Sequence, residues 1–391
     1  MTDLETGYAP APPRRGLRTG YTTGACAAAA TRGACLALSG DIRDEVSISL
    51  PAGFSASFPL LGVSASPPHA RASVIKDAGD DPDVTHGAEI SAEVAVGHEA
   101  PSGIGRDWSV SGHGAVARRL GPGSTLELRS GSGVGVVTRP GLGLPVGGPA
   151  INPVPRRMIA RSVRESLRPL AAMVTVTVSV RDGEVLARRT LNGRLGIEGG
   201  LSILGTTGVV RPYSTAAWKA SVLQGVDVAA AGGCTEIVAS TGGRSEGYAR
   251  RLFPDLPEAA FVEMGEFTGH LLKRARDQGV RVVHLSGMVG KFSKIACGHF
   301  MTHVAGNQVD TAYLAGIAER AGGQMDLVAA VRSANTARHA QELVTAAGLG
   351  GFFDILCEDV LRSCAELVGA LPEVRALLFD FKGGLLGRAP R

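Results

Sequence analysis

The sequence predicts two folded parts, an α+β N-terminal domain and an α/β C-terminal domain whose sheet is doubly wound, mainly parallel and Rossmann-like. Three observations lead to this prediction. The length of 391 residues suits two or three domains of roughly 150 residues each. Period-two strand patterns dominate the first half, whereas strands alternate with helices in the second half. We therefore expect a Pro-rich, disordered tail over 1–16, a domain over 17–195 and a second domain over 196–391.

In the N-terminal domain, one Ala-rich helix is expected to accompany several strands. Residues 25–38 are strongly helical by propensity, Thr22 or Thr23 is the expected N-cap, and Gly40 is the expected stop. A second helix is expected over 155–167. Strand patterns, of which the last is the clearest, cover 46–50, 89–96, 125–128, 135–138 and 173–180. Strands and helices mixed in this way indicate an α+β domain.

In the C-terminal domain, each expected strand leads into a turn or a helix. The first strand, 201–204, ends in a Gly-rich turn, and a helix follows it. The next strand, 236–240, also ends in a Gly-rich turn. Strands at 260–263 and 282–286 each precede a helix, and two or three further helices fill 308–370. This alternation predicts a parallel sheet with helices packed on it.

Composition and charge exclude several classes of protein. The net charge is only +4 and no Lys/Arg-rich run occurs, so the chain is not typical of a dedicated nucleic-acid binder. No apolar run reaches about 18 residues, and the acidic start lacks the features of a signal peptide. The six Cys form no CxxC pair, which is typical of a reducing compartment. These features predict a cytoplasmic protein that binds neither nucleic acid nor membrane, and they leave a homo-oligomer open.

The two Gly-rich turns are candidate ligand sites. They consist of Gly205, Thr206, Thr207 and Gly208 and of Thr241, Gly242 and Gly243. Each follows an expected strand, and ligands of open α/β sheets bind beyond the carboxyl ends of the strands. Free backbone N–H groups at the start of the following helix would face an anionic or polar ligand. Neither turn is a complete GxGxxG or GxxxxGK[ST] motif, so two ordinary turns between strand and helix remain an alternative.

A long loop rich in Gly and Pro, residues 131–158, is the densest signal in the chain. Regular structure cannot form at this density of Gly and Pro, and long loops in compact domains are usually functional or disordered. Between residues 131 and 168 there is one acidic residue, Glu165, against six arginines, at 139, 156, 157, 161, 164 and 168. Such a positive field suits a polyanionic ligand. A solvated basic helix face is the alternative for part of this group.

The segment 287–303 carries two lysines and two histidines that deserve a chemical interpretation. Spacing places His299 and His303 on one helix face, but HFMTH lacks the Glu of HExxH and no third ligand follows, so a zinc site is not indicated. One histidine could handle a proton. Lys291 and Lys294 flank a helix start, with plain solvent exposure as the alternative. The residues alone thus indicate an α/β enzyme with an anionic small-molecule ligand, and they leave the reaction open.

Four stretches of the chain resemble one family closely. They are LRTGYTTGACAAAA (17–30), the loop over 133–158 with PGLGLPVG and AINPVPRRM, LSILGTTGVVRP (201–212), and GKFSKIACG (290–298) with Thr302-His303. They resemble the cobalt-precorrin-5B C1-methyltransferases of cobalamin biosynthesis, the CbiD family. The resemblance implies transfer of a methyl group from S-adenosylmethionine to C1 of a corrinoid precursor. The products would be cobalt-precorrin-6A and S-adenosylhomocysteine.

The resemblance also gives the candidate residues their expected roles. S-adenosylmethionine would lie on Gly205, Thr206, Thr207, Gly208, Thr241, Gly242 and Gly243, at the carboxyl edge of one sheet. Corrinoid carboxylates would lie on Arg139, Arg156 and Arg157, and the pocket would be completed by Thr22, Thr23, Lys291 and Lys294. His303 is the candidate base if a ring proton must leave. The cobalt would enter with the substrate, so no protein-bound metal is expected.

Two alternatives remain at this point. One is a nucleotide-dependent corrinoid oxidoreductase, which the turn glycines permit, although we identify no acidic residue at the offset expected for a ribose contact. The other is a non-catalytic carrier that passes a corrinoid intermediate between enzymes, and the basic loop suits it equally well. A separate site for S-adenosylmethionine would argue against the carrier.

Overall fold

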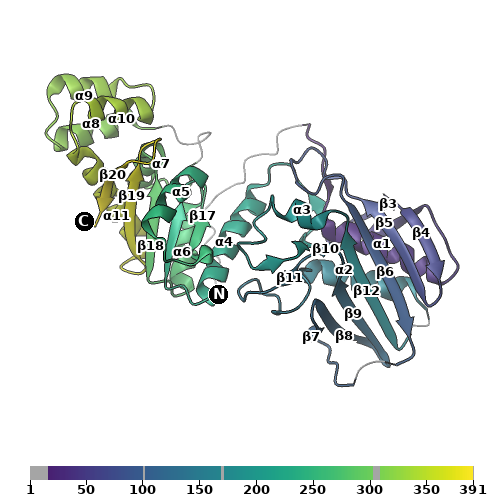
Figure 1. Cartoon of the computed structure of the whole chain (residues 1–391). Coiled ribbons are helices and arrows are strands. Elements are labelled where there is room, and N and C mark those ends of the chain that lie inside the picture. Colours follow the sequence, from purple (N-terminus) through teal and green to yellow (C-terminus); the bar gives the residue numbers. More distant parts are fainter. Residues whose placement is uncertain (1–15, 100–101, 169–170, 303–308, 391) are drawn as a thin grey trace. The chain divides into compact units, whose positions relative to one another are not determined.

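The computed structural model describes residues 16–99, 102–168, 171–302 and 309–390 of the chain (Figure 1). Almost all of the expected tail over 1–16, and the candidate base His303, lie outside these ranges. The chain forms two compact units, unit 1 (Met1–Ala216) and unit 2 (Ala217–Arg391). The expected boundary after residue 195 therefore lies too early, because the segment 196–216 belongs to unit 1.

Unit 1 is built on a mixed seven-stranded sheet (Figure 1). In spatial order its strands are β4 (Leu61–Ser66), β5 (His69–Ile75), β6 (Glu89–Gly97), β12 (Met173–Val180), β9 (Ser124–Ser130), β8 (Ala115–Gly121) and β7 (Ser109–Gly112). The central strand β12 runs antiparallel to β6 and parallel to β9. Every other residue of β12 is buried, as its alternating Val and Thr/Ser pattern predicts. The expected mixture of helices and strands in this part of the chain is confirmed.

Two helices, α1 (Thr23–Leu38) and α2 (Pro153–Ser166), supply a large part of the remaining core of unit 1. Most of α1 is buried, since its alanines and glycines allow neighbouring elements to approach closely. A Cβ at Gly24 would lie 2.5 Å from Pro155 of α2, and one at Gly33 would lie 2.6 Å from Leu60. A hairpin of β2 (Glu45–Ser49) and β3 (Ser55–Pro59) and the short helix α3 (Gly183–Ala187) also belong to this unit.

Short strand pairs hold the Gly/Pro-rich loop and the segment 196–216 in unit 1. The pairs are β10 (Gly133–Val134) with β14 (Gly200–Leu201), β11 (Val136–Val137) with β13 (Ile197–Glu198), and β1 (Gly20–Tyr21) with β15 (Val209–Val210). The expectation that 201–204 opens the C-terminal sheet is therefore wrong. Leu201 and Ile203 are buried in the core of unit 1, and Ile203 bridges to Ile151. An apolar run predicts burial, but it does not say against which sheet.

Unit 2 is built on a five-stranded sheet whose strands all run parallel except the last. In spatial order the strands are β17 (Phe261–Glu263), β16 (Glu236–Ser240), β18 (Val282–Gly287), β19 (Glu373–Phe379) and β20 (Leu385–Ala389). The helices of the described part of this unit, besides the one-turn η1 (Glu258–Ala260), are α4 (Thr215–Ala231), which starts at its boundary, α5 (Gly243–Leu252), α6 (Thr268–Asp277), α7 (Val289–Ala296), α8 (Thr311–Arg320), α9 (Met325–Arg332), α10 (Ala337–Ala346) and α11 (Gly351–Val368). Mixed α/β architecture, as expected, thus holds for both units.

Side chains from the two faces of this sheet join different cores. Ile237 and Ala239 of β16 pack in one cluster with residues of α6, α7 and α11, whereas Val238 packs in another with Ala249 of α5. Helices therefore cover both faces. Helices α8, α9 and α10 pack on one another (Figure 1). Among the residues that the structure describes, no helix is long and apolar enough to cross a membrane.

Candidate functional site

The structure divides the predicted site residues between the two units. Unit 1 holds the first turn and most of the substrate candidates: Gly205, Thr206, Thr207, Gly208, Thr22, Thr23, Arg139, Arg156 and Arg157. Unit 2 holds Thr241, Gly242, Gly243, Lys291 and Lys294. The expectation that both Gly-rich turns line the edge of one sheet is wrong, because only the second turn follows a strand of the parallel sheet.

In unit 1, Thr22 and Thr23 connect the start of α1 to the first of the two Gly-rich turns, Gly205 to Gly208. The Thr22 hydroxyl accepts a hydrogen bond from the Ala25 N–H (3.2 Å) and so caps the helix, as predicted. The Thr23 hydroxyl accepts from the Leu204 N–H (2.9 Å) and donates to the Leu204 carbonyl (3.2 Å). Gly205 has φ +131°, and a Cβ there would lie 2.3 Å from the Thr22 hydroxyl oxygen. Both hydroxyls are buried and engaged, so their direct role is to position this turn.

Thr23→Val is expected to lower the free energy of unfolding by about 1–2 kcal/mol, because valine keeps the shape of threonine and loses both bonds to Leu204. Chemical denaturation of the full chain measures this difference. Unchanged denaturation would show that the link between Thr23 and Leu204 contributes nothing to the stability of the turn.

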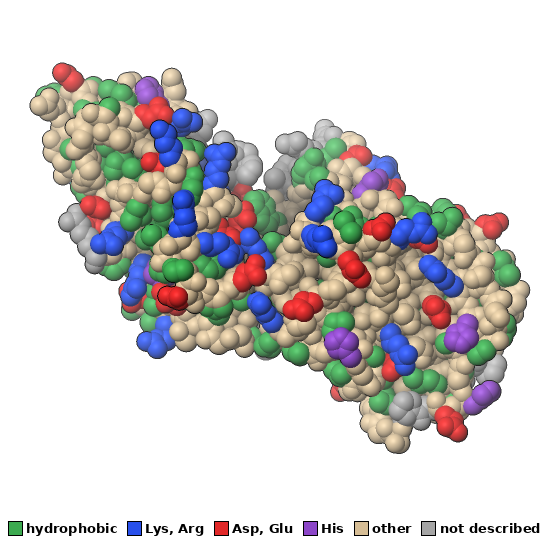
Figure 2. All heavy atoms as spheres, in the orientation of Figure 1, with side chains coloured by type: hydrophobic (Ala, Val, Ile, Leu, Met, Phe, Trp, Pro, Cys, Tyr) green, Lys and Arg blue, Asp and Glu red, His purple; other side chains and the backbone are tan. Residues whose placement is uncertain are grey.

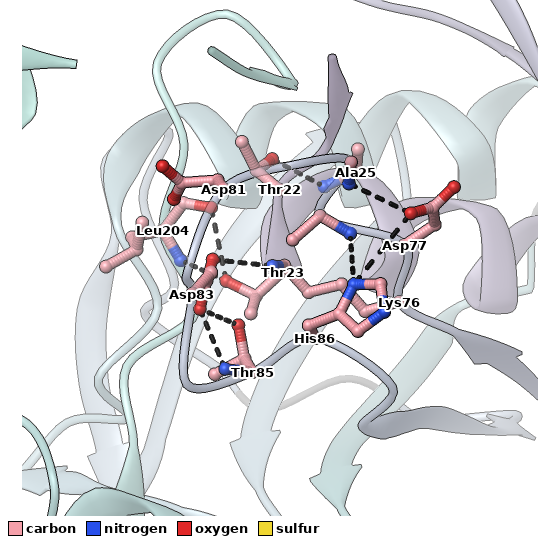
Figure 3. A network of polar contacts seen from close by, with 12 residues as sticks. Thr22, Thr23, Ala25, Lys76, Asp77, Asp81, Asp83, Thr85, His86 and Leu204 are labelled. Carbon is pink, nitrogen blue, oxygen red and sulfur yellow. Dashed lines mark hydrogen bonds and ion pairs between the residues drawn. The ribbon is translucent and has the colours of Figure 1, made fainter. Parts of the chain in front are cut away.

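A loop over 76–87 that sequence reasoning missed lies beside these threonines (Figure 3). The Lys76 side chain is only 1% exposed, and its Nζ donates to Oδ2 of Asp83 at 2.6 Å. The other oxygen of Asp83 accepts from the N–H (2.7 Å) and the hydroxyl (2.6 Å) of Thr85. The signal was available in KDAGDDPD (76–83), where one lysine precedes four aspartates.

The remaining aspartates of this loop fasten distant segments of unit 1. The Asp77 carbonyl accepts from the N–H of Tyr21 (2.7 Å), and its carboxylate pairs with Arg18, which lowers the pKa of Asp77 to about 2. The Asp81 carboxylate accepts from the N–H of Tyr213 (2.8 Å). These carboxylates are engaged in holding the chain together. Among the described residues, no three His, Cys, Asp or Glu side chains gather closely enough to hold a metal ion.

The three candidate arginines have different environments. Arg156 is 3% exposed; its Nε donates to the Ile151 carbonyl at 2.6 Å, and its guanidinium lies over the Trp108 ring. Burial lowers the pKa of Arg156 to about 10. Arg156 therefore supports the Gly/Pro-rich loop from inside and presents no free guanidinium, which corrects its expected role as a carboxylate ligand. Arg157 is exposed, and Arg139 is half-buried with its stem against Gly196.

Neither Arg139 nor Arg157 has an ion pair or a side-chain hydrogen bond within the described ranges, so both guanidinium groups are available. Figure 2 shows Lys and Arg side chains mixed with Asp and Glu over the visible face, without a continuous basic patch.

A cavity of about 260 Å³ in unit 1 is lined by none of the predicted site residues. Its charges are largely paired, since Arg181 lies 2.7 Å from Glu89.

In unit 2, Lys291 joins the two loops that follow β16 and β17. Its Nζ donates to the carbonyl of Thr241 (2.5 Å) and to that of Gly265 (3.1 Å). Burial lowers the pKa of Lys291, while the nearby charges of Glu266 and Glu263 oppose that shift. Lys294 is buried, and its Nζ donates to the Thr302 carbonyl (3.1 Å). Both lysines thus point into the unit, so they are not the free carboxylate ligands that we expected.

Four buried side-chain oxygens around this edge have no hydrogen-bond partner within the described part of the chain. They are Oγ of Ser240, Oε2 of Glu266, Oγ1 of Thr268 and Oγ1 of Thr302. Backbone bonds bring their segments together, because Met264 donates to the Ser240 carbonyl (2.8 Å) and Thr302 donates to the Glu266 carbonyl (3.2 Å). Buried polar groups are nearly always paired, so these oxygens make this edge a candidate site for a polar ligand.

A further carboxylate missed by sequence reasoning ends strand β17. Glu263 pairs in register with Ser240, the last residue of β16, and it is half-buried. In dinucleotide-binding sheets, an acidic residue about 20 positions after the Gly-rich turn contacts a ribose. Glu263 stands at about this distance after Gly243. The expectation that no acidic residue stands at this offset is therefore wrong. Unit 2 thus combines a Gly-rich turn, hydroxyls and carboxylates at one sheet edge, which suits a small polar ligand that carries a ribose or a positive charge.

Comparison with known proteins places these features in context. Residues 11–212 match the family model described as CbiD, and residues 301–390 match the model described as CbiD, C-terminal domain. A solved structure described as cobalamin biosynthesis protein (cbiD) from Archaeoglobus fulgidus is 26% identical, covers 85% of each chain and has a TM-score of 0.36.

Several relatives named cobalt-precorrin-5B C(1)-methyltransferase match almost the whole chain. The relative from Geobacillus sp. (strain WCH70) is 46% identical, over 97% of this chain and 98% of its own. The relative from Salinispora tropica is 49% identical, over 94% and 91% of the two chains. The relative from Thermus thermophilus is 47% identical, over 96% and 95%.

Proposed function

Because this chain belongs to the CbiD family, we propose that it transfers a methyl group from S-adenosylmethionine to C1 of cobalt-precorrin-5B. The protein is a C-methyltransferase of cobalamin biosynthesis. The observation that supports this most strongly is identity of 46–49% to methyltransferases of this name along nearly the full length. The carrier and oxidoreductase alternatives find no support among these names.

The methyl donor is proposed to bind at the carboxyl edge of the sheet in unit 2, in a Rossmann-like arrangement. From β16 the chain continues to β17 on one side, and from β18 it continues to β19 on the other side. Ligands of open α/β sheets bind at the carboxyl ends of two such strands, where the strand order switches. Thr241, Gly242 and Gly243 follow β16, and Lys291 lies on the helix that follows β18. The unpartnered buried oxygens at this edge fit a ligand with hydroxyl, amino and sulfonium groups.

Each group at this edge has a proposed task. Backbone N–H groups of the turn would bind the polar end of the donor, and Glu263 would accept hydrogen bonds from its ribose hydroxyls. Lys291 would keep the two loops in place. When bound, the donor supplies a methyl group, the electron pair of ring carbon C1 forms the new C–C bond, and the S–CH₃ pair stays on sulfur as S-adenosylhomocysteine leaves. Positioning of the two reactants then provides much of the catalysis.

The corrinoid is proposed to bind to unit 1 through Arg139 and Arg157. Both guanidinium groups are free of ion pairs with other described residues, and carboxylate groups on the macrocycle would accept bidentate hydrogen bonds from them. Arg156, Thr22 and Thr23 act indirectly, by fixing the loop and the turn from within. His303 stays the candidate base for the ring proton, and its test is the pH dependence of turnover in His303→Gln.

Neighbouring arginines on α2 are expected to give opposite results. Arg157→Ala should weaken binding of cobalt-precorrin-5B by about tenfold and leave the melting temperature unchanged. Arg156→Ala should lower the stability by about 2–3 kcal/mol, because two loop carbonyls lose a buried donor. Anaerobic absorbance titration and thermal unfolding measure the two effects, with the exposed Arg164→Ala as control. Wild-type affinity in Arg157→Ala would contradict the proposed carboxylate contact.

The reaction itself is tested with S-adenosylmethionine that carries a ¹³C-methyl group. Anaerobic incubation with cobalt-precorrin-5B should place the label on C1, detected by NMR, and release one S-adenosylhomocysteine for each product molecule. Corrinoid binding without transfer of the label would favour a carrier. Consumption of a nicotinamide cofactor without methylation would favour the oxidoreductase.

A further inference from the structure

Glu266 is an acidic side chain whose place in the fold is unusual. It lies in the loop after β17 and is only 4% exposed. Its Oε2 accepts no hydrogen bond, and the side chain forms no ion pair with any residue in the described ranges. Burial of an unpaired carboxylate is costly, and a bound ligand that supplies the missing partner would offset this cost.

Lys291 is a cation close to Glu266, but its ammonium group does not fully pair with this carboxylate. The charge of Lys291 acts on Glu266, but the Lys291 ammonium already donates to the carbonyls of Thr241 and Gly265. Lys294 is also engaged, with the carbonyl of Thr302. On the segments that backbone bonds bring to this loop, the hydroxyl oxygens of Ser240, Thr268 and Thr302 also lack hydrogen-bond partners among the described residues. The site therefore has the carboxylates of Glu266 and Glu263 and uncharged oxygens, while both lysines are engaged with backbone carbonyls. This arrangement favours a cationic guest.

We propose that Glu266 recognises the positive charge of the methyl donor and so makes the enzyme prefer S-adenosylmethionine to S-adenosylhomocysteine. This inference rests on the proposed donor site in unit 2. The two ligands share the adenosine and amino-acid groups, and they differ by one methyl group and by the positive charge on sulfur. Contacts with the ribose or the adenine cannot distinguish them. A carboxylate removed from water can, because Coulomb attraction is much stronger in a medium of low dielectric constant.

Such a preference has a functional consequence. After transfer of the methyl group, the sulfur is neutral and the attraction of Glu266 disappears. The product then binds less tightly than the substrate that replaces it. Glu266 would in this way favour release of S-adenosylhomocysteine and limit inhibition by product.

Calorimetric titration of the full chain with each ligand tests this inference. Glu266→Gln keeps the shape and removes the charge; it should weaken S-adenosylmethionine about tenfold and change S-adenosylhomocysteine by less than about threefold. Glu263→Gln removes the same charge from the same edge and should weaken both ligands equally. Glu258→Gln, on the exposed turn before β17, should change neither.

The outcomes separate this inference from the proposed function. If the wild-type chain binds neither ligand, the donor site itself is overturned. If the wild-type chain binds both and Glu266→Gln lowers both affinities equally, or neither, the recognition of charge by Glu266 is overturned and the donor site stands.

Thermal unfolding distinguishes a binding role from a structural one. Without ligand, Glu266→Gln should melt at or above the wild-type temperature, because the amide relieves a buried unpaired charge. The rise in melting temperature caused by S-adenosylmethionine should be smaller in this variant than in the wild type. A variant that melts below the wild type and keeps the full ligand-induced rise would assign Glu266 to the fold alone.

Discussion

Asp83→Asn is expected to lower the free energy of unfolding by about 3 kcal/mol, since it leaves the ammonium of Lys76 buried without its counter-charge. Lys76 is among the largest fully buried side chains of the chain, and Asp83 is its hydrogen-bond partner at 2.6 Å. The loop over 76–87 accepts hydrogen bonds from Arg18, Tyr21 and Tyr213. A change in its conformation would therefore also affect the segments next to α1 and to the Gly-rich turn over 205–208. Denaturation of the full chain, followed by circular dichroism, measures the change.

Two further measurements make this prediction specific to the pair. Lys76→Met removes the charge together with the need for a partner, so the double variant should be more stable than the sum of the two single changes predicts. Burial works to raise the pKa of Asp83, but the charge and hydrogen bond of Lys76 outweigh it and hold that pKa below its usual value. The contribution of the pair is therefore present above about pH 4 and is lost as the pH falls through the lowered pKa. This role would be contradicted if the stability losses of the two single variants simply added and if stability fell with pH in the variants as it does in the wild type.

Lys291→Met is expected to weaken S-adenosylmethionine binding by at least about tenfold. Lys291 joins the carbonyl of Thr241 to that of Gly265, and these carbonyls belong to the loops that are proposed to hold the donor. Methionine fills the same space without donating, so the loops lose their common anchor and the donor loses a fixed set of backbone N–H groups. Calorimetry measures the affinity, and circular dichroism verifies that the variant is folded.

The matched control for this change is Lys273→Met, an exposed lysine on α6 of the same unit. It should bind the donor as the wild type does. If Lys291→Met binds S-adenosylmethionine with wild-type affinity, the loops after β16 and β17 do not need this anchor, and the donor site must be placed elsewhere.

Patterns local in sequence predicted local structure well. The alternation of Val with Thr and Ser identified β12, and the Ala-rich run with its threonine cap identified α1. The carboxyl edge of the parallel sheet in unit 2 followed from strands alternating with helices. These features depend on side chains a few residues apart, and periodicity reports that arrangement directly.

Pairings between distant segments could not be predicted in this way. Leu201 belongs to unit 1 because β14 pairs with β10, some seventy positions earlier in the chain, and no local pattern contains that information. Short two-residue strands give too little alternation to reveal their partners. The loop over 76–87 was missed for a related reason, since a cluster of aspartates is typical of a solvated surface.

Helical spacing did carry one signal that sequence reasoning left unused. Arg156 lies three and seven residues before Ile159 and Val163, on the buried face of α2. Arg157 is the next residue along the helix and therefore lies off that face. Their different exposure follows from this geometry. The spacing predicts a buried guanidinium at 156, and such a group must find carbonyl partners within the fold.

The most direct test of the two-site proposal compares S-adenosylmethionine binding in three proteins by calorimetry. The wild type should bind one molecule per chain, Lys291→Met should lose most of that affinity, and Arg157→Ala should keep it while losing affinity for cobalt-precorrin-5B. This result would place the donor in unit 2 and the corrinoid on unit 1. Retention of donor binding in Lys291→Met together with its loss in Arg157→Ala would contradict this assignment and place the methyl donor on unit 1.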